Sequence, residues 1–193
     1  MKFFLLNSLF LSFFVFAIVS CNQAPSRTVT EMEFNVDTSL VTLPVSDSSL
    51  GISYRAPGGW TDIEATEEAL KQVHDGKIRV SKLIRNPSGN VVFSLTDVRD
   101  VPDSTFRHMD ENYKTVLNPS GAWSDIQKAE FNHAGFNVKQ YVLSRQGQTF
   151  FKMLFGNTSR PSFQVDYSIM IDSSYALNTK TLESIIGSLH RDH

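Results

Sequence analysis

Short stretches in which apolar and polar residues alternate fill most of the chain after residue 31. An alternation with a period of two is typical of a β-strand with one buried face. Several of these stretches are joined by only a few residues that include glycine or proline, such as 86–90 and 146–148, so we expect neighbouring strands to pair antiparallel. Six strands are predicted at residues 78–84, 91–98, 125–131, 136–145, 149–156 and 163–171. The same alternation at residues 32–36, 41–45 and 52–54 indicates further strands.

Three other segments have the spacing of amphipathic helices. Thr61 and Glu64 are spaced as in a capping box, which predicts a helix that begins at Thr61 and ends at Gly76. A second helix is predicted to begin with Asp103 or Ser104 as its N-cap. The apolar faces of the three helices are Ile63, Leu70 and Val73 in the first, Phe106, Met109, Tyr113 and Val116 or Leu117 in the second, and Leu182, Ile185, Ile186 and Leu189 in the third.

These elements predict an α+β fold with a largely antiparallel sheet of about six to eight strands and three helices. Residues 150–155 are apolar on both faces of their predicted strand. Such a strand is best buried when helices cover the sheet on each side. We therefore predict a helix–sheet–helix sandwich, formed by a single domain at residues 31–190.

The first 21 residues have a separate organisation. Lys2 precedes an apolar run at residues 3–19, and the small residue Ser20 precedes Cys21. This resembles a bacterial lipoprotein signal, with Ile18 and Ser20 at the lipobox positions. The resemblance implies that residues 1–20 are a signal peptide, that lipid is attached to Cys21, and that two or three acyl chains hold the domain on the membrane. A retained transmembrane helix and an ordinary signal peptide beside an incidental cysteine remain as alternatives.

Residues 22–30 are polar, and with the lipidated Cys21 they are expected to form a short tether to the domain. The residue after the cysteine is Asn22 and not an aspartate. By resemblance to enterobacterial sorting, this implies passage to the outer membrane. We therefore expect a protein of the bacterial cell envelope that faces the periplasm.

Composition excludes several classes of function. The chain has 18 basic and 20 acidic residues, so no basic excess indicates binding to nucleic acid. Cys21 is the only cysteine. Its acylation would leave no thiol for catalysis, a disulfide or a cysteine zinc site.

Four segments resemble PsbP-like and DcrB-like domains. They are residues 52–60, which end in Trp60, residues 91–95, the hairpin around Gly135, and the terminal helix at 182–189. The resemblance extends over residues 49–190. It implies an accessory or binding module, often a lipoprotein, with no shared catalytic residues.

The sequence gives no catalytic, cofactor or metal site. It contains no nucleophile elbow, no Ser-x-x-Lys motif and no glycine-rich phosphate loop. His190 and His193 are expected in a frayed tail. The alternative function is an envelope hydrolase with an unrecognised Ser/His/acid site, which would require a serine and a carboxylate beside His74, His108 or His133.

Trp60 and Trp123 each follow a glycine-containing turn. Either side chain would be suited to a partner or ligand contact, since tryptophan is favoured in binding hot spots. The competing interpretation is that each closes an edge of the core. The resulting hypothesis is a non-enzymatic, lipid-anchored envelope protein that binds a protein partner or a small ligand.

Overall fold

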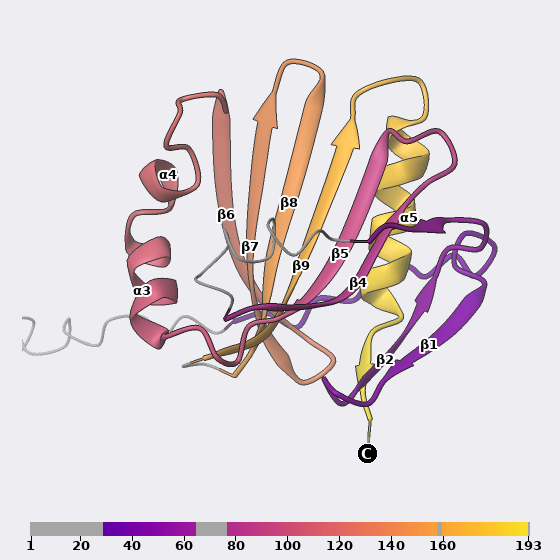
Figure 1. Ribbon diagram of the computed structural model, residues 1–193, viewed down its shortest axis with the longest axis horizontal. Coiled ribbons are helices and arrows are strands. Elements are labelled where there is room, and N and C mark those ends of the chain that lie inside the picture. The colour runs from indigo at the N-terminus through magenta and orange to yellow at the C-terminus, as the bar shows by residue number, and fades with distance from the viewer. Residues whose placement is uncertain (1–28, 65–76, 158–159, 193) are drawn as a thin grey trace, which may run out of the picture.

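The computed structural model describes residues 29–64, 77–157 and 160–192, and Figure 1 shows their arrangement. Within these ranges the strands are β1 (Leu43–Asp47), β2 (Ile52–Ala56), β3 (Thr61–Asp62), β4 (Arg79–Arg85), β5 (Val91–Asp97), β6 (Asp125–His133), β7 (Phe136–Arg145), β8 (Gln148–Gly156), β9 (Pro161–Met170) and β10 (His190–Arg191). The helices are α3 (Asp103–Glu111), α4 (Tyr113–Val116) and α5 (Tyr175–Gly187).

The central element is a seven-stranded antiparallel sheet with the order β3-β4-β5-β9-β8-β7-β6. The predicted hairpins at 86–90 and 146–148 join β4 to β5 and β7 to β8. Strand β9 is inserted between β8 and β5, so the last long strand of the chain occupies the middle of the sheet. A smaller sheet has the order β1-β2-β10.

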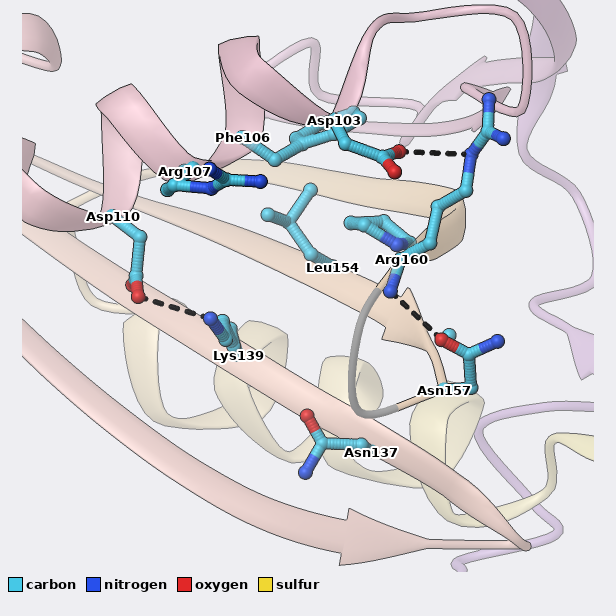
Figure 2. Close-up of a pocket in the computed structure, with 11 residues that line it drawn as sticks. Asp103, Phe106, Arg107, Asp110, Asn137, Lys139, Leu154, Asn157 and Arg160 are labelled. Carbon is cyan, nitrogen blue, oxygen red and sulfur yellow. Dashed lines mark hydrogen bonds and ion pairs between the residues drawn. The ribbon is translucent and has the colours of Figure 1, made fainter.

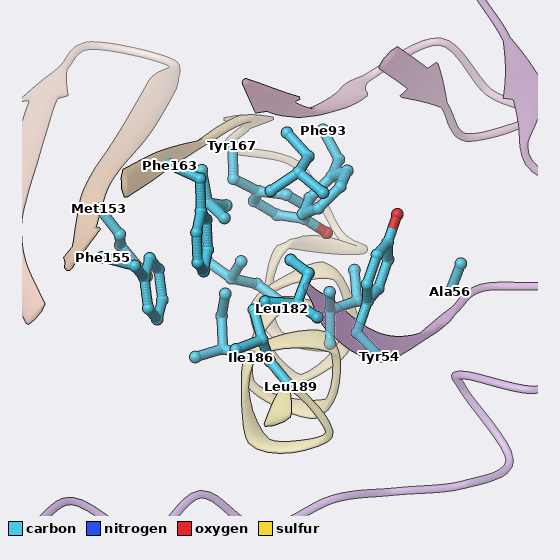
Figure 3. Close-up of a cluster of buried hydrophobic side chains, with 14 of the residues drawn as sticks. Tyr54, Ala56, Phe93, Met153, Phe155, Phe163, Tyr167, Leu182, Ile186 and Leu189 are labelled. Carbon is cyan, nitrogen blue, oxygen red and sulfur yellow. The ribbon is translucent and has the colours of Figure 1, made fainter. Parts of the chain in front are cut away.

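Helices cover both faces of the central sheet, which confirms the predicted α+β sandwich. On one face, α5 packs over the main core, shown in Figure 3. On the other face, which we call the α3 face, α3 and α4 cover a second core. The main core includes Phe93, Phe155, Phe163, Tyr167, Leu182 and Ile186, and the second core consists of Val98, Val101, Phe106, Ile126, Tyr141, Leu143 and Leu154.

Strand β8 contributes to both cores, as its sequence predicts. Met153 and Phe155 are buried in the main core, and Leu154 is buried in the second core. Phe150 and Phe151 pack against the second and main cores, respectively. The apolar character of both faces of β8 therefore follows from the helices on each side of the sheet.

The predicted strand at residues 32–36 is wrong. Residues 29–37 form an extended strap that makes one parallel bridge, between Glu31 and Asn132 of β6. The apolar positions of the strap pack across the end of α5 instead, because Phe34 and Val36 both contact the helix at Gly187. The alternation at residues 32–36 reflects an extended segment with one buried side. Among the described residues, this segment bridges a strand only at Glu31.

The boundaries of two predicted helices also change. Thr61 lies in β3 and not at a helix N-cap, and the N–H of Ile63 donates to the carbonyl oxygen of Leu83 at 2.9 Å. The rest of that predicted helix, residues 65–76, lies outside the described residues. Helix α3 has Pro102 as its N-cap, with no side-chain capping bond, so the predicted caps are wrong.

The end of the chain is more ordered than the predicted frayed tail. His190 and Arg191 form β10, which pairs with β2, and the N–H of Asp192 donates to the carbonyl oxygen of Gly51 at 3.0 Å. His193 lies outside the described residues. Among the residues that the structure describes, no helix combines the length and the apolar character needed to cross a bilayer.

Candidate functional site

A cavity of about 200 Å³ lies between α3 and the sheet, next to the connection between β8 and β9. Figure 2 shows the side chains that surround it. Its lining residues are Asp103, Phe106, Arg107, Asp110, Asn137, Lys139, Leu154, Gly156, Asn157, Arg160 and Pro161.

Helical spacing brings four of these residues to the cavity. Asp103, Phe106, Arg107 and Asp110 are separated by three, four and seven positions, which places them on one face of α3. On β7, residues 137 and 139 are two positions apart and point to the same side of the sheet. The cavity therefore lies where a polar stripe of the helix faces polar positions of the strand.

Asp110 lies at one end of the cavity, and its carboxylate has three partners. Its Oδ1 atom lies 2.6 Å from Lys128 Nζ and accepts a hydrogen bond from Tyr141 OH at 2.7 Å. Its Oδ2 atom lies 2.9 Å from Lys139 Nζ. Partial burial acts to raise the pKa of Asp110, but these three donors outweigh it and hold the pKa at about 2. Burial and the bond to Asp110 raise the pKa of Tyr141, so its hydroxyl stays a donor.

A second ion pair closes the opposite end. Arg160 Nε lies 3.1 Å from Asp103 Oδ1, and its guanidinium also donates to the carbonyl oxygen of Arg99. The Arg160 N–H donates to Asn157 Oδ1 at 2.7 Å. Gly156 permits the close approach of the Arg160 backbone, because a Cβ atom at position 156 would lie only 2.0 Å from the carbonyl oxygen of Arg160.

The space between the two ion pairs has an apolar base and, among the residues that the structure describes, one cation without an ion pair. Phe106 and Leu154 are 9% and 3% exposed and belong to the second core. In Figure 2 the Arg107 side chain lies between the Asp110–Lys139 and Asp103–Arg160 pairs. Arg107 is exposed, and none of the described carboxylates forms an ion pair with it.

Neither candidate tryptophan lines this cavity. Trp60 is half-buried against the main core and stacks on Tyr167, with ring centroids 6.3 Å apart. Trp123 is half-buried against the second core, and its backbone N–H donates a hydrogen bond to Asn118 Oδ1 at 2.9 Å. The Arg145 guanidinium lies 4.9 Å from the centre of the Trp123 ring. Both side chains close core edges, and Trp123 also borders a separate depression of about 190 Å³.

The described histidines do not form a hydrolytic site. Both ring nitrogens of His133 lie near backbone oxygens, 3.1 Å from Met32 O and 2.8 Å from Ile186 O. His133 is the last residue of β6, and the hairpin turn that follows it begins at the next residue. His108 is exposed on α3 and contacts Asn112. His74 lies outside the described ranges, and within them no cluster of three His, Asp, Glu or Cys side chains could hold a metal ion.

Sequence reasoning missed the cavity residues Arg107, Asn137, Lys139 and Arg160. The helical spacing of Asp103, Phe106, Arg107 and Asp110 was readable as a mixed polar and apolar face. The sequence could not predict that this face approaches β7, Asn157 and Arg160, because that approach depends on strand order. The structure thus adds a polar cavity apart from Trp60 and Trp123, whose contacts with a partner or ligand stay predictions.

No family model matches the sequence, and no curated protein matches it. Among solved structures, the chain is similar to cyanobacterial PsbP (CyanoP) from Synechocystis sp. PCC 6803, with 11% identity over 79% of this chain and 93% of that chain and a TM-score of 0.47. It is also similar to the Ran-binding protein Mog1p of Saccharomyces cerevisiae, with 11% identity over 82% and 96% of the two chains and a TM-score of 0.40.

A third similar structure is LpqN of Mycobacterium tuberculosis, which is involved in cell envelope biogenesis. It shares 12% identity over 78% of this chain and 90% of that chain, with a TM-score of 0.38. The likeness to these three structures concerns the fold alone. The fold and the cavity define an α+β sandwich with a small charged pocket, and the function has to be argued from that pocket.

Proposed function

We propose that this protein is a non-enzymatic, lipid-anchored module of the bacterial cell envelope that binds a protein partner or a small ligand in the cavity beneath α3. The observation that carries the proposal is the free Arg107 guanidinium above an apolar base formed by Phe106 and Leu154. A few directed polar groups around an apolar pocket are what a binding site requires.

The lipid anchor rests on Cys21 and on the apolar run that precedes it. Eight residue steps separate Cys21 from Val29, where the described chain begins, so a fully extended tether would reach at most about 28 Å. From Thr30 onwards the strap is fixed to the domain, because the N–H of Asn132 donates to Thr30 O at 2.9 Å. An acylated Cys21 would therefore hold Val29, and with it the domain, within that distance of the membrane surface.

The anchor is tested by metabolic labelling of the full chain with a palmitate analogue. We expect label on the unchanged protein and none on Cys21→Ala, which should be recovered in the soluble fraction. Ser20→Ala is the matched control, since it keeps a small residue before the cysteine. Label and membrane retention in Cys21→Ala would overturn the anchor.

The binding function is tested by photo-crosslinking of the full-length chain in intact cells. A diazirine amino acid at Ser104, an exposed residue on α3 beside the cavity, should give a reproducible adduct that mass spectrometry identifies as peptide or small molecule. The control carries the same group at Ser88, which is exposed in the β4–β5 turn. Equal adduct formation at both positions, or none at Ser104, would contradict a binding site beneath α3.

A further inference from the structure

Among the described residues around the cavity, the charges leave one positive charge without a partner. Asp110 contacts Lys128 and Lys139, and Lys128 also lies 3.2 Å from Glu130, so these four groups balance. Asp103 and Arg160 balance each other at the other end. Arg107 remains, and it is the group that an anionic ligand would neutralise.

The remaining charge selects the kind of anion. An arginine fork matches the two oxygens of a carboxylate, with which it forms paired, charge-assisted hydrogen bonds. A phosphate would bring a larger negative charge between Asp103 and Asp110, whose carboxylates line the same cavity. A ligand with one negative charge therefore fits the electrostatics of the cavity better than a multiply charged one.

Asn137 provides a second polar group for such a ligand. It lies on β7, across the cavity from Arg107 on α3 (Figure 2), and its side chain is half-buried. Within the described part of the chain, no protein group forms a hydrogen bond with its amide. The amide can donate one hydrogen bond to a carboxylate oxygen without breaking an existing contact.

The size and the base of the cavity limit the rest of the ligand. A volume of about 200 Å³ equals that of about six or seven water molecules in the liquid. Phe106 and Leu154 offer carbon surface but no hydrogen bonds. A short hydrocarbon chain next to the carboxylate would cover them.

We infer that the cavity binds a monocarboxylate with a short apolar chain, held by Arg107 and Asn137. This inference rests on the proposed function and names the ligand class of its site. The same chemistry is available from a free short-chain acid and from the C-terminus of a peptide that ends in a small apolar residue. In both cases the carboxylate pairs with Arg107 and the carbon chain lies on Phe106 and Leu154.

The test measures binding to the full-length chain in detergent by saturation-transfer NMR and calorimetry. The probes are butyrate, its neutral analogue butyramide, inorganic phosphate, and the peptide acetyl-Ala-Ala-Val with a free or an amidated C-terminus. We expect butyrate or the free-acid peptide to bind, and butyramide, phosphate and the amidated peptide to bind at least ten-fold more weakly. The better of the two acids identifies the source.

Variants link the binding to the cavity. Arg107→Gln should weaken binding of the preferred acid at least ten-fold, and Arg107→Lys should weaken it less, because it keeps the charge but loses the fork. Arg85→Gln, an exposed arginine on β4, is the matched control and should bind as the unchanged protein does. Thermal unfolding of each variant shows whether it is folded.

The outcomes separate the two proposals. Equal binding of butyrate and butyramide, or unchanged binding in Arg107→Gln, would overturn the carboxylate inference. If the Ser104 crosslinks persist in that case, the binding function still stands with another ligand class. If those crosslinks are also missing, both proposals fail.

Discussion

Replacing Gly187 by alanine tests whether the strap is packed on the end of α5. Gly187 is the last residue of this helix, and its Cα faces the strap. An added methyl group would lie 2.7 Å from Phe34 Cβ and 2.8 Å from Val36 Cγ2. Both distances are well below van der Waals contact, so either the helix end or the strap has to move.

Two opposing contributions set the size of the effect. In a helix that is free of tertiary contacts, Gly→Ala stabilises by roughly 0.5–1 kcal/mol, because alanine loses less backbone entropy on folding. Overpacking a fixed site costs about 1–3 kcal/mol. The strap has little freedom to move, since the Asp37 N–H donates to Ser184 Oγ at 3.0 Å and the Asp37 carboxylate lies 2.7 Å from Lys180 Nζ. We therefore expect Gly187→Ala to lower the free energy of unfolding by about 1–2 kcal/mol.

The assay is urea unfolding of the full-length chain, combined with hydrogen exchange at the amides of Met32 and Asp37. In the unchanged protein the Met32 N–H donates to the carbonyl oxygen of Asn132 at 2.8 Å, so its exchange reports on the docked strap. Gly187→Ala should speed exchange at both amides. The matched background is the double variant Phe34→Gly/Val36→Ala, which removes both side-chain atoms that the new methyl group would meet.

The sign of the effect decides the outcome. In the Phe34→Gly/Val36→Ala background the helix preference is freed from both side-chain clashes, and Gly187→Ala should then be neutral or stabilising. A stabilising Gly187→Ala in the unchanged protein, with no change in exchange at Met32 or Asp37, would refute the packing of the strap on α5.

Three further predictions concern the cavity. The pKa of Asp110 is about 2, below its ordinary value of 3.8. The stability that its ionised form contributes is therefore complete above about pH 4 and is lost as the pH falls toward 2. Asp110→Asn should reduce this fall in the free energy of unfolding, measured from pH 2 to 6. Tyr141→Phe removes a buried donor to that carboxylate and should cost about 1.5–3 kcal/mol in urea unfolding. If Asp110 is already asparagine, whose amide oxygen still accepts this bond, the loss should shrink to about 0.5–1.5 kcal/mol, the value of a neutral hydrogen bond. Gly156→Ala would place a methyl group against the backbone of Arg160 and should cost about 3 kcal/mol or more in thermal unfolding. Unchanged stability would contradict the close contact between Gly156 and the Arg160 carbonyl oxygen.

Local pattern was enough to predict most elements of the central sheet. Strand β7 occupies the predicted residues 136–145, and the hairpins at 86–90 and 146–148 lie where glycine and proline indicated turns. The apolar residues on both faces of β8 predicted helices on each side of the sheet. These features depend on neighbours within a few residues, and therefore leave a readable period in the sequence.

The errors occurred where a distant segment decided the conformation. The alternation at residues 32–36 resembles a strand, but its apolar side is buried by α5, about 150 positions further along the chain. Thr61 has the spacing of a helix N-cap, but pairing with Arg85 places it in β3. In both cases a tertiary contact outweighs a weak local preference.

The sequence by itself determined the fold class and the two-sided burial of the sheet, whereas the anchor at Cys21 stays a prediction. Only the tertiary structure decided where a binding site lies. Arg107 and Asn137 line the same cavity because α3 packs over β7, and Arg160 closes one end of it because β9 lies beside β8. Periodicity records which side of an element is buried, but it contains no information on which elements pack together, and the cavity exists only through that packing.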